Sequence, residues 1–290
     1  MPTTQHGDVG DGHLFYEHAL SPHPHTPLAA HRRTGLADVH MHTTASDGTG
    51  TPAEVLAFAR DHTNLDVIAI TDHDTLDGAL RARDLLAASG PERFELIIGE
   101  EVSTREGHLL ALFIERRIPP GLSIERSIEL IHEQGGLAVV AHPFNRVFRH
   151  SVQRAVMNRL LRQPGLHPDG IETLNGSFAG IGSSRVAMTA ARRVYRWAET
   201  GGSDAHTPTA IGCASTRFVG RTVDDLRASL LARTTAPVGG FWHAAEYMAL
   251  ARSRIASGGV AASRVAAPRV RVRGQALRAR LSARVGGRLG

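Results

Sequence analysis

Seven short apolar runs alternate with helical stretches along most of the chain, and this alternation restricts the fold more than any other feature. The predicted strands are 36–41, 66–71, 94–102, 109–114, 137–141, 170–174 and 198–203, and the predicted helices are 52–63, 77–89, 123–134, 151–162, 183–197 and 222–232. Buried strands that alternate with helices are typical of βα units around a parallel sheet. Seven units in roughly 210 residues favour a closed α/β barrel over an open sheet.

Several predicted helices begin and end at residues that favour those boundaries. Thr51 precedes Pro52 and Glu54, a pattern typical of a helix start. Gly135 and Gly136 form a stop for the helix before them. Because barrel sites form at the carboxyl ends of the strands, this edge is where functional side chains are expected.

Composition adds limits on location rather than on fold. Apolar residues make up 42% of the chain and charged residues 21%, as in ordinary globular proteins. The single cysteine, Cys213, excludes an internal disulfide framework, and residues 1–10 show no secretory signal, so a cytoplasmic location is predicted. No apolar run approaches the roughly 20 residues of a membrane span.

Composition also divides the chain into three parts. Residues 1–34 lack periodicity and predict a disordered leader rich in histidine and proline, followed by a catalytic barrel over 35–243. Residues 244–290 hold ten arginines and one acidic residue, whereas the rest of the chain has a net charge of −4. The prediction for 244–290 is a flexible tail; a short basic helix around Leu277, Leu281 and Val285 that touches lipid or nucleic acid is the alternative.

Metal-binding side chains recur where the predicted strands end or begin. His40 and His42 are two apart on one strand, so both imidazoles can reach the same ion. The predicted ligands are His40, His42, Asp47, His73, Glu101, His108, His142, Asp204 and His206. A single histidine of this kind would most often be structural, but nine such groups at one edge are hard to explain by packing.

The number of ligands predicts more than one ion. A single catalytic zinc needs about three protein ligands, so nine ligands predict two or three divalent ions, with a carboxylate such as Glu101 between them. Mixed imidazole and carboxylate ligands suit Zn, Mn or Fe. Such a centre carries excess positive charge, attracts phosphate, and lowers the pKa of bound water so that a hydroxide forms near neutral pH.

The ordered set of motifs resembles the PHP (polymerase and histidinol phosphatase) family. The resemblance covers residues 36 to about 235 and rests on residues 38–43, 46–48, 70–75, 99–101, 141–143 and 202–206. It implies a distorted (β/α)7 barrel with a trinuclear metal centre, phosphoester hydrolysis, and the same nine ligands. Asp47, where histidinol phosphatases more often have histidine, resembles the branch of small phosphoesterases and nucleoside-bisphosphate phosphatases.

One segment departs from the nucleoside-bisphosphatase pattern. Members of that group carry a helical insertion between the positions that match His108 and His142, but here only 34 positions separate the two. The prediction is therefore an open site, with the arginine-rich segment 146–162 as an alternative cover.

Further side chains are predicted to support catalysis or bind substrate. Asp72 flanks His73 and is predicted to orient imidazoles, with ordinary turn formation as the alternative. Arg146 and Arg149 are predicted to clamp a phosphate, with plain surface arginine as the alternative. Ser46 and Asn175 are predicted to contact substrate, or else to shape the loop and the barrel wall.

These features together predict a metal-dependent phosphoric ester hydrolase. Its substrate is predicted to be a nucleotide or another small phosphomonoester, attacked by a metal-bound hydroxide. One alternative is a phosphodiesterase or 5′-end exonuclease, with nucleic acid bound at the site or by the basic tail. A metal-bound regulatory barrel without activity is the other alternative. The sequence leaves the oligomeric state open.

Overall fold

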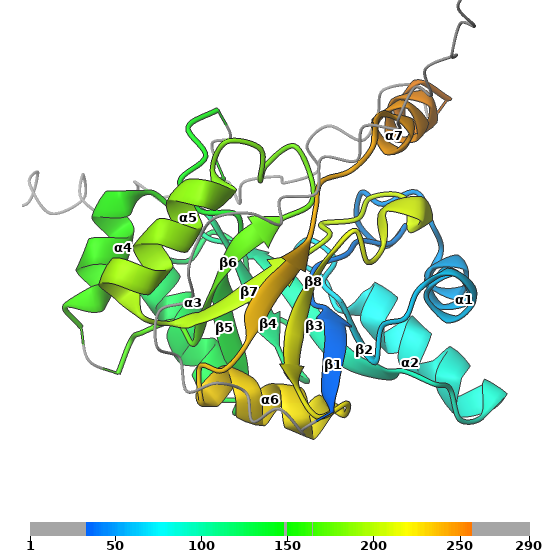
Figure 1. Ribbon diagram of the computed structural model, residues 1–290, viewed down its shortest axis with the longest axis horizontal. Coiled ribbons are helices and arrows are strands. Elements are labelled where there is room, and N and C mark those ends of the chain that lie inside the picture. The colour runs from blue at the N-terminus through cyan, green and yellow to red at the C-terminus, as the bar shows by residue number, and fades with distance from the viewer. Residues whose placement is uncertain (1–32, 148–149, 164, 257–290) are drawn as a thin grey trace, which may run out of the picture. The chain divides into compact units, whose positions relative to one another are not determined.

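Nine strands form one sheet in the part of the chain that the computed structural model describes, residues 33–147, 150–163 and 165–256 (Figure 1). The strands are β1 (Thr34–Asp38), β2 (Val67–Ile70), β3 (Glu95–Ser103), β4 (His108–Leu112), β5 (Leu137–Val140), β6 (Gly170–Asn175), β7 (Ala198–Gly202), β8 (Ala214–Val219) and β9 (Ala236–Gly239). The α-helices are α1 (Pro52–His62), α2 (Asp77–Ser89), α3 (Ile124–His132), α4 (Arg154–Leu161), α5 (Ser184–Ala190), α6 (Val223–Leu231) and α7 (Ala244–Ala256). A π-helical turn η1 (Ala191–Tyr195) extends α5, and a short 3-10 helix η2 (Pro208–Ala210) follows β7.

The strands follow the order β7-β6-β5-β4-β3-β2-β1-β8-β9 across the sheet. β1, β2 and β3 are parallel to one another, and so are β5, β6 and β7. β4 is antiparallel to both of its neighbours. β8 pairs antiparallel with β1, and β9 pairs antiparallel with β8. Two parallel halves therefore meet across one reversed strand.

The two ends of the sheet come together and nearly close it into a barrel. Thr216 of β8 accepts a hydrogen bond from the Gly201 amide of β7 at 3.0 Å and donates one to the Gly201 carbonyl at 2.8 Å. Thr235, just before β9, donates to the Glu199 carbonyl at 2.7 Å. A parallel bridge also pairs Met41 with Ala205, beyond the ends of β1 and β7. The carboxyl ends of the first and seventh strands thus lie side by side.

The reversal of β4 decides where His108 lies. His108 begins β4 and pairs directly with Ser103 at the end of β3. Since β4 runs in the opposite direction, its amino end lies at the edge where the parallel strands have their carboxyl ends. A histidine at the start of a strand therefore joins side chains that follow the ends of the others.

Local sequence accounts for the helix boundaries. Thr51 and Glu54 form a reciprocal capping box at the start of α1, and Thr222 and Asp225 form another at α6. The Ser123 side chain accepts a hydrogen bond from the Arg126 amide and caps α3.

Apolar side chains fill both the interior of the sheet and the layer between the sheet and the helices. β2 and β5 are buried at every position, as expected for strands covered on both faces. Ile124, Ile128 and Ile131 of α3 pack in one cluster with Leu109 and Val140 of the sheet. This packing holds the strand ends, and hence the side chains that follow them, in fixed positions.

The predicted α/β barrel is confirmed, and each of the seven predicted strands overlaps an observed one. β8 and β9 were missed because neither forms a continuous apolar run: β8 contains serine, threonine and arginine, and β9 contains proline and glycine. α7 lies within the predicted tail 244–290. The remainder of that tail, 257–290, with Leu277, Leu281 and Val285, lies outside the described residues, and so does the predicted leader except residues 33 and 34. None of the described helices is long and apolar enough to span a membrane.

We expect Thr216→Val to destabilise the protein, because it leaves an amide and a carbonyl of Gly201 without their partner inside the sheet. Leaving buried polar groups unsatisfied costs about 1–3 kcal/mol in the free energy of unfolding. Urea unfolding measures this change. Thr189→Val is the matched control, because its exposed hydroxyl donates only to the Arg185 carbonyl in its own helix. Equal stabilities of the two variants would contradict the role given to Thr216.

Candidate metal centre

All nine predicted ligands lie close together at the edge of the sheet where the parallel strands end. They come from seven places in the chain: the segment after β1, the loop before α1, the segment after β2, β3, the start of β4, the segment after β5, and the segment after β7. Eight of the nine appear in three overlapping groups in which the ligand atoms lie within 4.8 Å of one another. The groups are His42, Asp47, His73 and His206; His40, His42, Glu101 and Asp204; and His73, Glu101 and His108.

Glu101 lies at the centre of this cluster and is almost completely buried. Its Oε2 lies 3.2 Å from His40 Nε2, 3.3 Å from His42 Nε2 and 3.2 Å from His73 Nδ1. Its Oε1 lies 2.7 Å from His108 Nδ1 and 2.9 Å from His142 Nε2. This second contact brings the ninth ligand, His142, into the cluster. One carboxylate thus faces five imidazoles, as a carboxylate shared between ions would.

Two further carboxylates lie on one side of Glu101. Asp204 Oδ1 lies 3.4 Å from His40 Nε2 and 3.1 Å from His42 Nε2. Asp47 Oδ1 lies 3.2 Å from His206 Nε2, and 3.8 and 3.9 Å from His42 and His73 nitrogens. His42 and His73 therefore each stand between two groups of ligand atoms.

Several buried polar atoms of the cluster have no hydrogen-bond partner, and this fits cation binding. They are His40 Nε2, His42 Nδ1, Asp47 Oδ1 and His142 Nδ1. Buried polar atoms are normally satisfied, so these atoms have coordination capacity to spare. Imidazole nitrogens and carboxylate oxygens at these separations suit divalent zinc, manganese or iron. The residues therefore fit a site for divalent metal ions.

Two of the candidate ligands have backbone conformations that side chains rarely adopt. The φ angle is 26° at His142 and 52° at Asp204. Positive φ at a residue other than glycine costs free energy and persists where the surroundings impose it, often at functional sites. Here each residue lies two positions after the end of a strand, and its side chain lies in the cluster.

A layer of hydrogen bonds orients the candidate ligands. Glu172 of β6 accepts from His40 Nδ1 at 3.0 Å and from the His142 amide at 2.8 Å. Asn175 donates to Asp204 Oδ2 at 3.2 Å, and Ser177 donates to the same oxygen at 2.7 Å. Such partners fix the orientation of metal-binding side chains and raise their basicity.

The predicted role of Asn175 in contacting substrate therefore has a structural alternative, because its side chain is buried and bonded to Glu172 and Asp204. Ser177 was missed by the sequence reasoning, since a serine in a glycine-rich loop carries no signal of its own. Glu172 is the one charged residue of β6, which marks it as a candidate functional residue. The sequence does not tell whether its side chain points towards the cluster.

Asp72 supports a loop through its side chain, and its backbone carbonyl accepts a hydrogen bond from the Glu101 amide at 3.2 Å. Its carboxylate accepts from the Thr43 amide at 2.7 Å, from the Thr43 hydroxyl at 2.7 Å and from the Ser46 hydroxyl at 2.6 Å. Ser46 is thereby tied to the loop that carries Asp47. Both residues can position Asp47.

The structure describes one of the two predicted phosphate-binding arginines. Arg146 is exposed and lies in the segment after His142. Arg149 lies outside the described residues.

The chain after β9 supplies two side chains near the cluster. The indole of Trp242 lies 5.9 Å from the His206 ring, between centroids, and donates from Nε1 to the Ser203 carbonyl at 2.7 Å. Arg254 of α7 lies 3.4 Å from Asp47 Oδ2. Both were missed, because their approach to the cluster depends on how the chain folds back after β9.

Charges in the cluster are strongly coupled. Burial opposes ionisation of Glu101, but the neighbouring His73, His108 and His40 outweigh it, and its pKa lies well below the ordinary value. Burial also opposes protonation of His42, but hydrogen bonds and charge interactions with Asp204 and Glu101 raise the pKa of His42 to about 10. Without ions, the carboxylates thus retain protons on neighbouring imidazoles.

Comparisons with known proteins agree with this geometry. The model of the PHP domain matches residues 38–179, and a PHP-associated model matches residues 185–235. An uncharacterised protein of Methanocaldococcus jannaschii is 35% identical over 150 residues, which cover 48% of this chain and 81% of that protein. The chain belongs to the PHP domain family.

Two further proteins are similar to this chain. The 5′-3′ exoribonuclease Rnm of Escherichia coli is 42% identical over 84 residues, only 28% of each protein. A two-domain protein of Bacteroides vulgatus that contains a predicted PHP-like metal-dependent phosphoesterase has the same fold, with a TM-score of 0.59 and 21% identity. The match covers 72% of this chain and 66% of that protein. The family resemblance and the barrel predicted from the sequence are both confirmed.

We expect Glu101→Gln to lower the number of bound ions by at least one per chain, because the carboxylate that faces five imidazoles loses its charge. Elemental analysis after dialysis against zinc or manganese measures the ions. Glu100→Gln is the matched control, since the neighbouring Glu100 is also buried but accepts from the Ile118 amide at 2.8 Å, away from the cluster. Full metal content in Glu101→Gln would contradict the central position of Glu101 in metal binding.

We also expect metal binding to release protons at pH 7.5. The pKa of His42, about 10, keeps its imidazole protonated in the metal-free protein, whereas a metal ligand must be neutral. Metal affinity should therefore increase with pH until the pH passes about 10. Calorimetric titrations with zinc in two buffers of different protonation enthalpy measure the release. Identical heats in the two buffers would show that no proton leaves.

Proposed function

We propose that this chain is a metal-dependent phosphoesterase. The observation that carries the proposal is the cluster of nine imidazoles and carboxylates around the buried Glu101. Divalent ions held there would supply an activated water and would stabilise charge on the oxygens of a phosphate ester. The PHP-like phosphoesterase fold of the Bacteroides protein supports the same conclusion.

Within this proposal, the protein residues hold and orient the reacting groups. Glu101, Asp204 and Asp47 would bind the ions, each together with the imidazoles beside it. Glu172 keeps the His40 ring in place through Nδ1, and Asn175 and Ser177 keep Asp204 in place. Asp72 fixes the loop of Ser46 and Asp47. Arg146 and Arg149 remain proposed contacts for the substrate phosphate.

The short segment between His108 and His142 favours substrates of different size. Residues 108–142 contain only β4, α3 and β5 as regular elements, so no helical insertion covers the cluster from this segment. A small phosphomonoester is the first candidate substrate. The end of a nucleic acid is the second, supported by the likeness to Rnm, a 5′-3′ exoribonuclease. The complete ligand set disfavours a regulatory barrel without activity.

A panel of phosphate esters with and without chelation tests the proposal. We expect hydrolysis of at least one ester, loss of hydrolysis after chelation, and recovery on addition of zinc, manganese or iron. Asp204→Asn should lower kcat/KM at least about 100-fold, since even an outer partner of a ligand contributes about 10–100-fold. Asp224→Asn, on the exposed surface of α6, is the control and should be unchanged. Absence of turnover on the whole panel by metal-loaded protein would refute the phosphoesterase proposal.

A further inference from the structure

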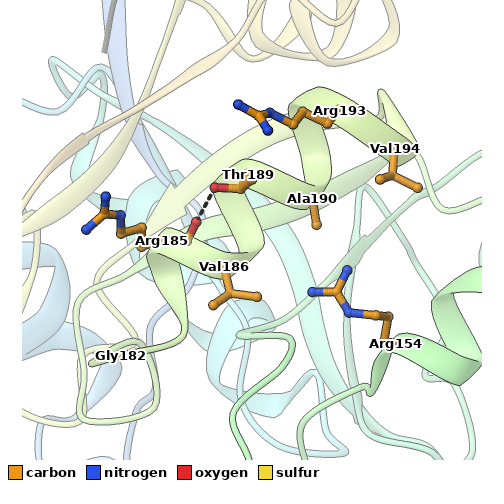
Figure 2. Close-up of a pocket in the computed structure, with 8 residues that line it drawn as sticks. All are labelled: Arg154, Gly182, Arg185, Val186, Thr189, Ala190, Arg193 and Val194. Carbon is orange, nitrogen blue, oxygen red and sulfur yellow. Dashed lines mark hydrogen bonds between the residues drawn. The ribbon is translucent and has the colours of Figure 1, made fainter. Parts of the chain in front are cut away.

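A groove of about 400 Å³ lies on the surface formed by α4, α5 and η1, outside the metal cluster (Figure 2). Arg185 and Arg193 lie on one flank of the helix formed by α5 and η1. Val186 and Val194 lie along the neighbouring flank, which faces Arg154 at the start of α4. The two arginines are eight residues apart, and so are the two valines, so each pair lies about two helical turns apart on its flank. A cationic flank thus lies beside an apolar one.

The arginines of this groove have charge to offer a ligand. All three are exposed, and within the described part of the chain none of them forms an ion pair with an acidic side chain. The Arg154 guanidinium lies over the Phe144 ring, 5.2 Å from its centroid. Residues 173–198 contain four arginines and no acidic residue. One of these four, Arg192, forms an ion pair with Glu199 at 2.8 Å. Arg185 and Arg193 thus lie in a stretch of sequence that contains no acidic residue. The groove therefore complements a polyanion.

The spacing of the arginines indicates an extended anion. Arg185 and Arg193 are eight residues apart, about 12 Å along a helix at 1.5 Å per residue. A single phosphate would contact both guanidinium groups only if the two long side chains bent towards each other. A chain with repeated phosphates can contact both, and its bases can lie on the apolar flank formed by Val186 and Val194.

One loop connects the groove to the metal cluster. Ser177 donates to Asp204, and Gly182, five residues later, lines the groove. Five residues span at most about 18 Å, so the groove begins within that distance of the cluster. Phe178 and Ile181 lie between them with 53% and 47% of their surface exposed. An exposed aromatic ring beside a basic groove is the usual platform for stacking a base.

We propose that this groove binds single-stranded nucleic acid, with one phosphate at the metal cluster and neighbouring nucleotides running over Phe178 onto Arg185 and Arg193. This proposal rests on the proposed phosphoesterase function and gives it a substrate class. The groove contributes affinity and direction, whereas the chemistry belongs to the cluster. Small esters occupy the cluster alone and do not reach the groove.

Binding of a strand of about 12 nucleotides with a hydrolysis-resistant phosphorothioate backbone tests the groove, a length within known single-strand site sizes. We expect the double variant Arg185→Ala/Arg193→Ala to raise the Kd at least about tenfold at moderate salt. The slope of log K against log salt should fall by about 1.4, for two lost phosphate contacts. Fluorescence anisotropy of the full, metal-loaded chain measures both quantities.

Arg81→Ala/Arg83→Ala is the matched control, because it removes two exposed arginines from α2 and retains every other arginine, including those of 257–290. Phe178→Ala tests stacking separately and should raise the Kd about fivefold or more. Equal Kd values for the groove and control variants would overturn the proposal. So would binding of polyglutamate with the same affinity and the same dependence on Arg185 and Arg193.

Hydrolysis of 4-nitrophenyl phosphate separates failure of the groove from failure of the phosphoesterase proposal. The groove variant should hydrolyse this small ester like the wild type, and only its KM for an oligonucleotide should rise. If the wild type hydrolyses the small ester but the groove variant binds strands normally, the groove proposal fails alone. If strand binding depends on the groove while no phosphoester is hydrolysed, the binding surface stands and the phosphoesterase function fails.

Discussion

The structure depends on the placement of one buried carboxylate among five imidazoles. Glu101 has almost no contact with water, and a buried charge is stable only where it is paired and hydrogen-bonded. Its partners come from segments after β1, β2 and β5 and from the start of β4, so these segments must converge before the carboxylate is satisfied. The same convergence that compensates the buried charge assembles the ligands of the metal centre. Folding and site formation are therefore closely coupled in this barrel.

The architecture explains how such distant segments converge. Strands in parallel bring their carboxyl ends to one edge, and the reversed β4 adds His108 to that edge from its amino end. Closure through Thr216 and Gly201 then brings the segment after β7, with Asp204 and His206, against the segment after β1. A flat sheet in the same order would leave these two segments at different places along its width. Near closure is therefore a requirement of the site.

The sequence predicts which side chains gather at this edge because each is marked by its position at the end or beginning of an apolar run. It cannot predict the supporting residues equally well. Ser177 acts through a loop whose course depends on β6 and β7, and Trp242 and Arg254 reach the cluster only after the chain folds back from β9. Asp72 is an example: its proximity to His73 in sequence suggested support of an imidazole, and its carboxylate accepts hydrogen bonds from Thr43 and Ser46. Tertiary geometry, not local pattern, decides these roles.

The contact between Arg254 and Asp47 has a consequence for the chain beyond β9. Asp47 turns one carboxylate oxygen towards His206 and the other towards the guanidinium of α7. An ion bound by Asp47 would weaken the attraction between this carboxylate and Arg254. Movement of α7 would in turn change the electrostatic potential at the ion. By thermodynamic linkage, the factor by which metal loading alters docking of the helix equals the factor by which docking alters metal affinity. Docking of α7 and metal binding would therefore be coupled through Asp47.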